Sequence, residues 1–455
     1  MRRGARSQRL ARGHRSGGRN GAGVGSRHAR GHPRAQASRR PRGHRLVTDG
    51  SIVATGCDDG VCRLWDPQSG DVLRTLDDAN AAVRFVRFAA DGSTLLVGAY
   101  DATMRVYDTS TWTVRSQLRH PIQWERAAVQ ASDRVIIGSF GANPVVHPID
   151  DDNAPSFTYG INFLAVDDTD VVVGRDDGSV MSVRPASTGA AARRLLARHT
   201  SIVNGAAFSP DGRHVASTDY RGVIHISRRD GSATTSFAAP EGGPINSVVW
   251  HPGGEMLFTA GYDGVIRRWH IEGHHRGAWP AHHSPIKSLT YSRSCDLLIA
   301  GSSDGTLSAW SDGDQAWRAD DPTMVLVNSV AADDVGVIVS ASRDLQVRRW
   351  DAATGALIEA LPRVHRKSIK AIATTGGGDR LVSGSYDGTA TLWHLHNGRW
   401  TWKRLLHHGK PGVPAVGFGN GASLGRVFTA GWDGSLAWWG VDGSLLGFSD
   451  LTGEP

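Results

Sequence analysis

The sequence has few cysteines and no long apolar run. Three Cys in 455 residues are too few for a framework of disulfide bonds, which favours a reducing compartment. No apolar run approaches the roughly 18 residues that a bilayer crossing requires, so we expect no membrane span. Fifteen Trp and 56 Gly are typical of a β-rich protein with many tight turns. We therefore expect a cytoplasmic, strand-rich protein.

Lysine and acidic residues are missing from residues 1–45, which hold 14 Arg. The rest of the chain has 37 basic and 44 acidic residues, a net charge of −7. Because phosphate binding requires a clustered basic surface, nucleic acid is not the expected partner of this acidic part. Apolar side chains are also scarce in residues 1–45, so we expect a disordered tail.

Three interpretations of the tail stay open. An Arg/Gly-rich arm contacts RNA or DNA phosphates without sequence preference. A transit peptide forms an amphipathic helix, which the missing apolar positions disfavour. A GC-rich reading frame translated out of phase gives the same composition, and a mis-assigned start is the interpretation that we favour.

From residue 46 onward the chain repeats one pattern. An apolar strand is followed by a short turn, usually with Asp-Gly, and then by an alternating strand that usually ends in Trp. The clearest copies are LVSGSYDGTATLW (381–393), LFTAGYDGVIRRW (257–269) and LIAGSSDGTLSAW (298–310). Each copy also has an earlier apolar strand, such as IVNGAAF (202–208). A single copy cannot bury both faces of its sheet, so the copies are expected to stack on one another.

The turn Asp marks ten copies at steps of 36 to 46 residues, the period of one propeller blade. The marker positions are Asp59, Asp101, Gly141, Asp177, Arg221, Asp263, Asp304, Asp344, Asp387 and Asp433. The pattern predicts an all-β protein, a β-propeller of four-stranded antiparallel blades.

The repeated segments from about residue 46 to 450 resemble the WD-repeat (WD40) family. In that family a His, a Ser or Thr, the turn Asp and the Trp form a hydrogen-bonded tetrad within a blade. His199, His282 and His365 each lie 22 residues before their turn position, which supports this register. The resemblance gives the following residues this structural role: His365, Ser383, Asp387, Trp393, His282, Asp304, Trp310, Thr259, Asp263, Trp269, Thr429, Asp433 and Trp439.

Three copies depart from the family pattern. Arg221 and Ser227 stand where Asp and Trp are expected, and His147 and Val183 replace Trp in the two copies before. These blades are expected to lack the tetrad. The first copy leaves too little room for an inner strand before Ile52, so we expect a truncated first blade.

Seven blades are the commonest ring in the family, and the last seven copies make one. We therefore expect three units: the tail (1–45), three blades of a partial second propeller (46–161) and a seven-bladed propeller (162–455). A single ten-bladed ring and an eight-bladed ring with two extra copies are the alternatives.

The residue before each turn marker is expected to lie at one mouth of the ring. Aromatic residues are enriched there, and exposed Tyr, Trp and Arg are typical of binding hot spots. The alternative is that these rings pack on the neighbouring turn. The predicted partner-binding residues are Tyr100, Tyr220, Tyr262, Arg343, Tyr386 and Trp432.

The resemblance implies a non-catalytic scaffold that binds other proteins or peptides at this mouth, in signalling or complex assembly. A propeller-based hydrolase is the alternative, but a His-Ser-Asp set that recurs with the fold is better explained as a structural network. Contact with RNA or DNA through the tail is another alternative. Cys57 with Cys62, and the pairs at His274, His282 and His407, lack the ligand sets of metal sites, so no metal, cofactor or catalytic residue is expected.

Overall fold

The structure is a computed structural model, and it describes a large part of the chain after residue 40. The described residues are 41–46, 51–57, 59–89, 91–101, 103–119, 125–131, 134–139, 145–148, 160–185, 191–239, 243–406, 408, 412–419 and 425–451. The predicted tail lies outside them except for residues 41–45. Within the described ranges, no helix has the length and apolar character that a membrane crossing requires.

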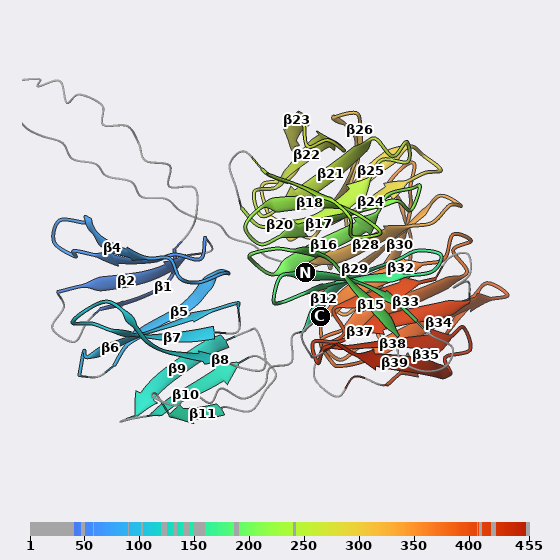
Figure 1. Cartoon of the computed structure of the whole chain (residues 1–455). Coiled ribbons are helices and arrows are strands. Elements are labelled where there is room, and N and C mark those ends of the chain that lie inside the picture. Colours follow the sequence, from blue (N-terminus) through green and yellow to red (C-terminus); the bar gives the residue numbers. More distant parts are fainter. Residues whose placement is uncertain are drawn as a thin grey trace, which may run out of the picture. The chain divides into compact units, whose positions relative to one another are not determined.

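The described part before residue 150 forms two four-stranded sheets and one three-stranded sheet, all antiparallel (Figure 1). Their strands are β1 (Pro41–Leu46), β2 (Val53–Cys57), β3 (Cys62–Trp65), β4 (Val72–Leu76), β5 (Val83–Phe88), β6 (Thr94–Ala99), β7 (Thr103–Asp108), β8 (Val114–Arg119), β9 (Glu125–Ala131), β10 (Arg134–Ser139) and β11 (Val145–Pro148). The prediction of a truncated first blade is wrong, because β1 pairs with β2. Part of the predicted tail therefore supplies the missing strand.

Seven four-stranded sheets follow in the described residues from 160 onward. The first four comprise β12 (Ile161–Val166), β13 (Val171–Arg175), β14 (Ser179–Arg184), β15 (Ala192–Arg198), β16 (Val203–Phe208), β17 (His214–Asp219), β18 (Val223–Arg228), β19 (Thr234–Ala238), β20 (Ile245–Trp250), β21 (Met256–Gly261), β22 (Val265–His270), β23 (His275–Pro280), β24 (Ile286–Ser292), β25 (Leu297–Ser302), β26 (Thr306–Ser311) and β27 (Asp314–Asp320).

The last three sheets complete the strand order. They comprise β28 (Val327–Ala332), β29 (Val337–Ser342), β30 (Val347–Asp351), β31 (Leu357–Ala360), β32 (Ile369–Thr374), β33 (Arg380–Ser385), β34 (Ala390–His396), β35 (Arg399–Leu405), β36 (Ala415–Phe418), β37 (Arg426–Ala430), β38 (Ser435–Gly440) and β39 (Leu445–Asp450). In each sheet the four strands pair in chain order, as a meander.

The turn chemistry explains why the strands pair in this way. Between β33 and β34, Gly388 has φ +82°, a left-handed conformation that glycine adopts without steric cost. The Asp387 carboxylate accepts the backbone N–H of Thr389 at 3.0 Å, which closes the turn. In β33 and in the first half of β34, which flank this turn, nearly all residues are buried, so both faces of these strands pack against other parts of the protein.

Apolar side chains form the core between neighbouring sheets. One cluster joins Ile299 with Ile338 and Trp350, and the next joins Val339 with Trp393. Trp350 and Trp393 are almost completely buried, and burying such a side chain stabilises the fold by about 2 to 3 kcal/mol. No sheet could bury these residues alone, so each depends on its neighbour.

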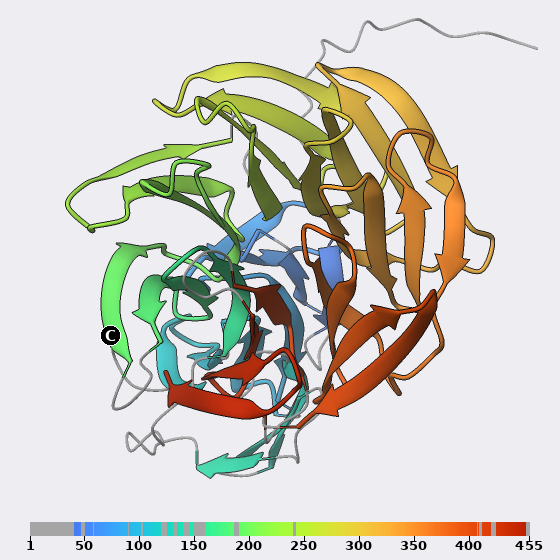
Figure 2. The same ribbon diagram turned by 90° about the vertical axis from the view of Figure 1, so that its right-hand side faces the viewer.

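In the seven sheets from β12 to β39, the first strand of each sheet contacts the first strand of the next. The last of these first strands, β36, contacts β12. A core cluster shared by Ile161 and Phe428 joins the last sheet to the first. The sheets follow one another around a common centre (Figure 2). The described sheets from β12 to β39 therefore form a ring of propeller blades, whereas the predicted division at residues 161 and 162 stays a prediction.

Candidate functional site

The residues that the family pattern assigned to the copy at 365–393 are hydrogen-bonded to one another. His365 Nε2 lies 2.8 Å from Ser383 Oγ, and Trp393 Nε1 donates to the same oxygen at 3.0 Å. His365 Nδ1 lies 3.4 Å from Asp387 Oδ2. Ser383 is completely buried between the imidazole and the indole, so its hydroxyl is not placed to attack a substrate.

Hydrogen bonds keep the turn carboxylates of two of these networks ionised. Burial would raise the pKa of Asp387, but hydrogen bonds from His365 and Thr389 outweigh it and hold the pKa far below the usual value. The pKa of Asp433 is lowered in the same way, against burial, by His408 and a neighbouring Ser. Each of these two partly buried carboxylates is therefore ionised and accepts hydrogen bonds from its neighbours.

In the copy at 282–310 the hydroxyl comes from a different strand. His282 Nδ1 lies 3.1 Å from Asp304 Oδ2, and its Nε2 lies 2.8 Å from Ser308 Oγ. Trp310 Nε1 also donates to Ser308 Oγ, at 2.8 Å. The sequence does not predict this hydroxyl, because the expected position on β25 holds Ala300.

In the last copy the histidine is His408, which was not among the predicted network residues. Its Nε2 lies 2.8 Å from Thr429 Oγ1, and Trp439 Nε1 donates to that oxygen at 2.9 Å. Its Nδ1 lies 3.5 Å from Asp433 Oδ1. His408 precedes the turn Asp by 25 residues instead of 22, so the regular spacing did not find it.

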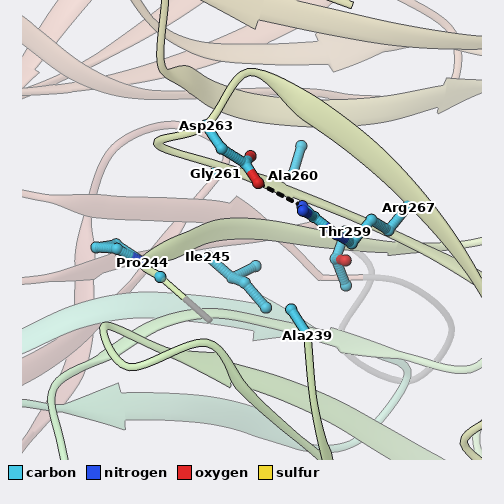
Figure 3. A pocket seen from close by; sticks show the side chains of 9 residues that line it. Ala239, Pro244, Ile245, Thr259, Ala260, Gly261, Asp263 and Arg267 are labelled. Atoms are coloured by element: carbon cyan, nitrogen blue, oxygen red, sulfur yellow. Dashed lines mark ion pairs between the residues drawn. The ribbon is translucent and has the colours of Figure 1, made fainter. Parts of the chain in front are cut away.

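The copy at 257–269 pairs its turn Asp with arginine. Trp269 Nε1 donates to Thr259 Oγ1 at 2.9 Å, as predicted for this pair, while Asp263 Oδ2 lies 2.6 Å from Arg267 Nη1. Figure 3 shows this ion pair beside a cavity of about 20 Å³, the space of one water molecule. No ligand larger than water fits there.

Arginine has the same position in four copies. Each follows its turn Asp by four residues and pairs with it: Arg63 with Asp59 (2.8 Å), Arg105 with Asp101 (2.7 Å), Arg267 with Asp263 (2.6 Å) and Arg348 with Asp344 (2.7 Å). The three copies completed by His282, His365 and His408 have the smaller Ser308, Thr391 and Ala437 at that position. The turn carboxylate therefore has a nitrogen partner in both groups of blades: the guanidinium of Arg in one group and the imidazole of His in the other.

The copy at 199–227 was predicted to lack the tetrad because Arg221 replaces the turn Asp. This prediction is wrong in part, because the copy contains a related polar network. His199 Nε2 lies 2.8 Å from Ser217 Oγ, and its Nδ1 lies 3.3 Å from Asp219 Oδ2. Asp219 accepts the backbone N–H of Arg221 and thus replaces the turn Asp two residues later. The imidazole of His225 stacks on His199 with ring centroids 3.9 Å apart.

The six predicted partner-binding residues occupy one structural position. The backbone N–H of each donates to a carbonyl just before the first strand of the same sheet: Tyr100 to Ala82, Tyr220 to Ile202, Tyr262 to Pro244, Arg343 to Leu326, Tyr386 to Ser368 and Trp432 to Gly412. They therefore lie beside the N-terminal ends of the first strands.

These six residues differ in exposure. Tyr220 is buried against Ala81, Ala82 and Ile202, and Tyr100 and Tyr262 pack on the same cluster. Tyr220 is therefore not an exposed binding residue in this structure. Arg343 is exposed, and Tyr262, Tyr386 and Trp432 are half-buried. We call Tyr262, Arg343, Tyr386 and Trp432 the rim residues.

Two rim residues from neighbouring sheets touch each other. The rings of Tyr386 and Trp432 have centroids 5.0 Å apart. Trp432 Nε1 donates to Asn162 Oδ1 at 3.2 Å, which connects the last sheet to β12. The other aromatic rim residue, Tyr262, has the ammonium of Lys287 4.2 Å above its ring centre.

Polar residues repeat next to the rim residues. In six of the seven first strands from β12 to β36 the pairing register shifts around the second residue, so that this residue has no partner in the ladder. Such a β-bulge aims a side chain away from the regular pleat and is common next to binding sites. We call these the bulge residues: Asn162, Asn204, Asn246, Lys287, Asn328 and Lys370. All are half-buried, whereas the residue before each is buried.

Among the described residues, one group has side chains placed for a metal ion. His270, Glu272 and His274 have donor atoms within 4.8 Å of one another in the turn between β22 and β23. Glu272 Oε2 lies 3.5 Å from His270 Nδ1 and 3.7 Å from His274 Nδ1. His270 Nδ1 also accepts the Glu272 backbone N–H, so this nitrogen already has a partner.

Comparison with known proteins identifies relatives that share this repeat. Residues 42–66, 70–108, 192–226, 231–270, 273–311 and 359–394 match the family model described as WD domain, G-beta repeat. The chain is 26% identical over 270 residues to the serine-threonine kinase receptor-associated protein of Mus musculus, which covers 59% of this chain and 65% of that protein. It is 30% identical over 164 residues to the COMPASS component SWD3 of Saccharomyces cerevisiae, covering 34% of this chain and 50% of that protein.

The matched region spans at most 65% of these two relatives. Among solved structures, the WD40 β-propeller domain of Doa1 is similar, with a TM-score of 0.53 at 18% identity, over 60% of this chain and 90% of that domain. A likeness at this identity concerns the fold alone. The family match and these relatives support a protein-interaction role.

Proposed function

Because this chain belongs to the WD-repeat family, we propose that it is a non-catalytic scaffold that holds an extended segment of a partner protein on the rim residues. The observation that carries the proposal is the contact between Tyr386 and Trp432, half-buried aromatic residues from two sheets with ring centroids 5.0 Å apart. Large aromatic side chains of this kind dominate the free energy of binding at protein interfaces. Among the bulge residues beside them, Lys287 and Lys370 offer ammonium groups to the segment.

Burial of the polar networks supports the absence of catalysis. His282 and His365 are nearly inaccessible, and their hydroxyl partners Ser308 and Ser383 are completely buried. A catalytic set needs a nucleophile that a substrate can reach. These residues instead stabilise individual blades, which leaves binding as the function of the ring.

The named relatives suggest the setting. One relative is named for association with a kinase receptor and another as a component of a complex, and we propose the same class of role, in signalling or complex assembly, for this chain. We also propose that it acts in the cytoplasm, given that it has three cysteines, all free. Partner proteins, not small substrates, would then be its ligands.

The test is affinity capture with three forms of the purified full-length chain. The wild type is compared with the double variant Tyr386→Ala and Trp432→Ala, and with Trp402→Ala, which removes a 48% exposed indole from the outer strand β35. Proteins captured by the wild type and by the Trp402 variant, but not by the double variant, are the expected result. Equal capture by all three forms would exclude the rim residues as the binding site.

Circular dichroism and the thermal midpoint establish that the double variant is folded. Where the double variant loses stability, Trp432→Phe provides a milder change, because it keeps the ring contact and removes the hydrogen bond to Asn162. Capture of the same proteins by Trp432→Phe and their loss with Trp432→Ala would assign binding to the aromatic surface.

A further inference from the structure

The bulge residues bring two lysines to the same end of the ring. Lys287 is the second residue of β24 and Lys370 the second residue of β32, and both are released from strand pairing by a bulge. One sheet separates these strands, since β24 contacts β28 and β28 contacts β32. The sheet between them contributes Asn328 at the same position and the exposed Arg343 at the rim.

The environment of Lys370 contains no compensating acid among the described residues. Burial, and then the charge of Lys287, lower the pKa of Lys370 to about 8. Its ammonium forms no ion pair in the described part of the chain, while Lys287 lies over the ring of Tyr262. Two half-buried ammonium groups that repel each other destabilise the free protein, and such groups are typical of ligand-binding sites.

The neighbouring bulge residues Asn246 and Asn328 are uncharged. Asn328 Nδ2 donates to the carbonyl of Ile369 at 2.7 Å, and Asn246 Nδ2 donates to the carbonyl of Ile286 at 2.7 Å. On the far side of the ring, Asp176 lies beside Asn162, and burial raises the pKa of this carboxyl well above its usual value. The bulge positions of β24, β28 and β32 therefore hold two cations and one uncharged amide, with no acidic residue.

We propose that Lys287 and Lys370 bind the carboxylate of an Asp or Glu side chain in the partner segment held by the rim residues. This inference rests on the function proposed above and specifies the chemistry of the partner. A carboxylate accepts charge-assisted hydrogen bonds from both ammonium groups, and it removes their mutual repulsion. The amide groups of Asn246 and Asn328 hold the adjacent strand ends in place, so the two lysines are positioned before the ligand arrives.

The rest of the site favours an extended protein segment over a nucleic acid. Two lysines and one arginine are far fewer cations than a nucleic-acid surface needs to neutralise successive phosphates. The rim adds the paired aromatic rings of Tyr386 and Trp432, and the backbone N–H of Tyr386 donates to the carbonyl of Ser368, two residues before Lys370. This combination suits an acidic residue flanked by apolar ones.

The experiment selects ligands from a displayed library of random dodecapeptides on the immobilised full-length chain. Enriched peptides are synthesised with amidated C-termini, so that side chains supply the only carboxylates. Their dissociation constants are measured by fluorescence anisotropy with the wild type, with Lys287→Gln combined with Lys370→Gln, and with the Tyr386 and Trp432 double variant. Arg293→Gln combined with Arg399→Gln removes the same charge from exposed sites and serves as the control.

The expected result is enrichment of Asp or Glu at one peptide position, with affinity reduced about tenfold or more by the lysine variants and unchanged by the arginine control. Changing that Asp or Glu to its amide should cause the same loss with the wild type and none with the lysine variants. Rim-dependent peptides without an acidic position, or acidic peptides insensitive to the lysine variants, would overturn this inference and leave the proposed function intact. The absence of any rim-dependent peptide would overturn both.

Discussion

The guanidinium of Arg348 pairs with Asp344 at 2.7 Å, across the turn between β29 and β30. Arg348 is completely buried, and its Nε also donates to Asp321 Oδ2 at 2.8 Å. Burial opposes ionisation of Asp321, but hydrogen bonds from Thr323 and Arg348 outweigh it and lower the pKa of Asp321 to about 2. One arginine thus satisfies two carboxylates in a blade that lacks the histidine.

Replacing Arg348 by Ala should strongly destabilise the protein. The change leaves Asp344 and Asp321 without their buried cation, and removal of one partner of a buried ion pair costs about 3 to 5 kcal/mol. The free energy of unfolding from urea titration should fall by that amount. Arg293→Ala, at an exposed turn, is the control and should change it by less than about 0.5 kcal/mol. A similar small effect of both variants would contradict this account of the pair.

His225 should make the protein less stable in mild acid. Burial, and then the neighbouring His199, lower the pKa of His225 to about 4 from 6.5, with Asp219 acting in the opposite sense. The unfolded chain therefore takes up a proton before the folded chain does, and stability falls as the pH drops from about 6.5 to 4. The loss is complete below the folded pKa.

The variant His225→Phe keeps an aromatic ring on His199 and cannot be protonated. Its thermal midpoint should fall less than that of the wild type between pH 7 and pH 5, and His396→Phe, at an exposed position, should behave like the wild type. Parallel pH profiles for the wild type and the His225 variant would refute the assignment.

Gly264 and Gly398 separate two effects of adding a methyl group. Both have positive φ, +74° and +73°, so alanine strains the backbone at either position by about 1 kcal/mol. At Gly398 a Cβ meets nothing within 4 Å, whereas at Gly264 it overlaps the carbonyl oxygen of His282. We expect Gly264→Ala to cost more than about 3 kcal/mol in urea titration, because the backbone must move. Equal costs would mean that the loop at His282 moves freely.

Lys370→Gln should stabilise the free protein. With its pKa lowered to about 8 from 10.5, Lys370 loses its proton in the folded state before the unfolded state does. Stability therefore rises with pH between about 8 and 10.5, and the uncharged variant gains stability below that range. At pH 7 the thermal midpoint of the variant should be about 2 to 4 °C higher, and at pH 10 the difference should shrink. A lower midpoint for Lys370→Gln at pH 7 would show that the ammonium stabilises the fold.

The propeller fold was predictable because each copy of the repeat contains its own sequence signals for turns, strands and buried positions. Asp387 and Gly388 show a tight turn, the alternation on either side shows paired strands, and Trp393 shows which face is buried. The hydrogen bonds among His365, Ser383 and Asp387 follow from the same register. Each of these signals lies within one copy of the repeat and does not depend on distant residues.

Other parts of the site could not be predicted from one copy. A longer loop moves His408 out of the common spacing, and Asp219 replaces a turn Asp from a position two residues earlier. The pairing of Arg348 with Asp344 has a sequence signal, an Arg four residues after the turn Asp, but its meaning appears only when copies with and without histidine are compared.

The bulges depend on the register between two strands, which alternation alone does not reveal. At the start of β20, for example, Asn246 follows Ile245. The sequence shows a polar residue in an apolar strand there, but it does not show that the strand pairing shifts at this residue. The predicted roles of the rim residues in binding stay predictions, as does the division of the chain at residue 161.

The repeated bulge has an evolutionary consequence. Its second residue has no partner in the ladder, so a substitution there leaves the strand pairing of its own sheet intact and acts on contacts with the next sheet, such as the bond from Asn328 to the carbonyl of Ile369. Asn and Lys already interchange at this position within a single chain. Duplicated copies of such a gene can therefore vary at these six positions, while selection for folding acts on their neighbours and keeps the architecture constant.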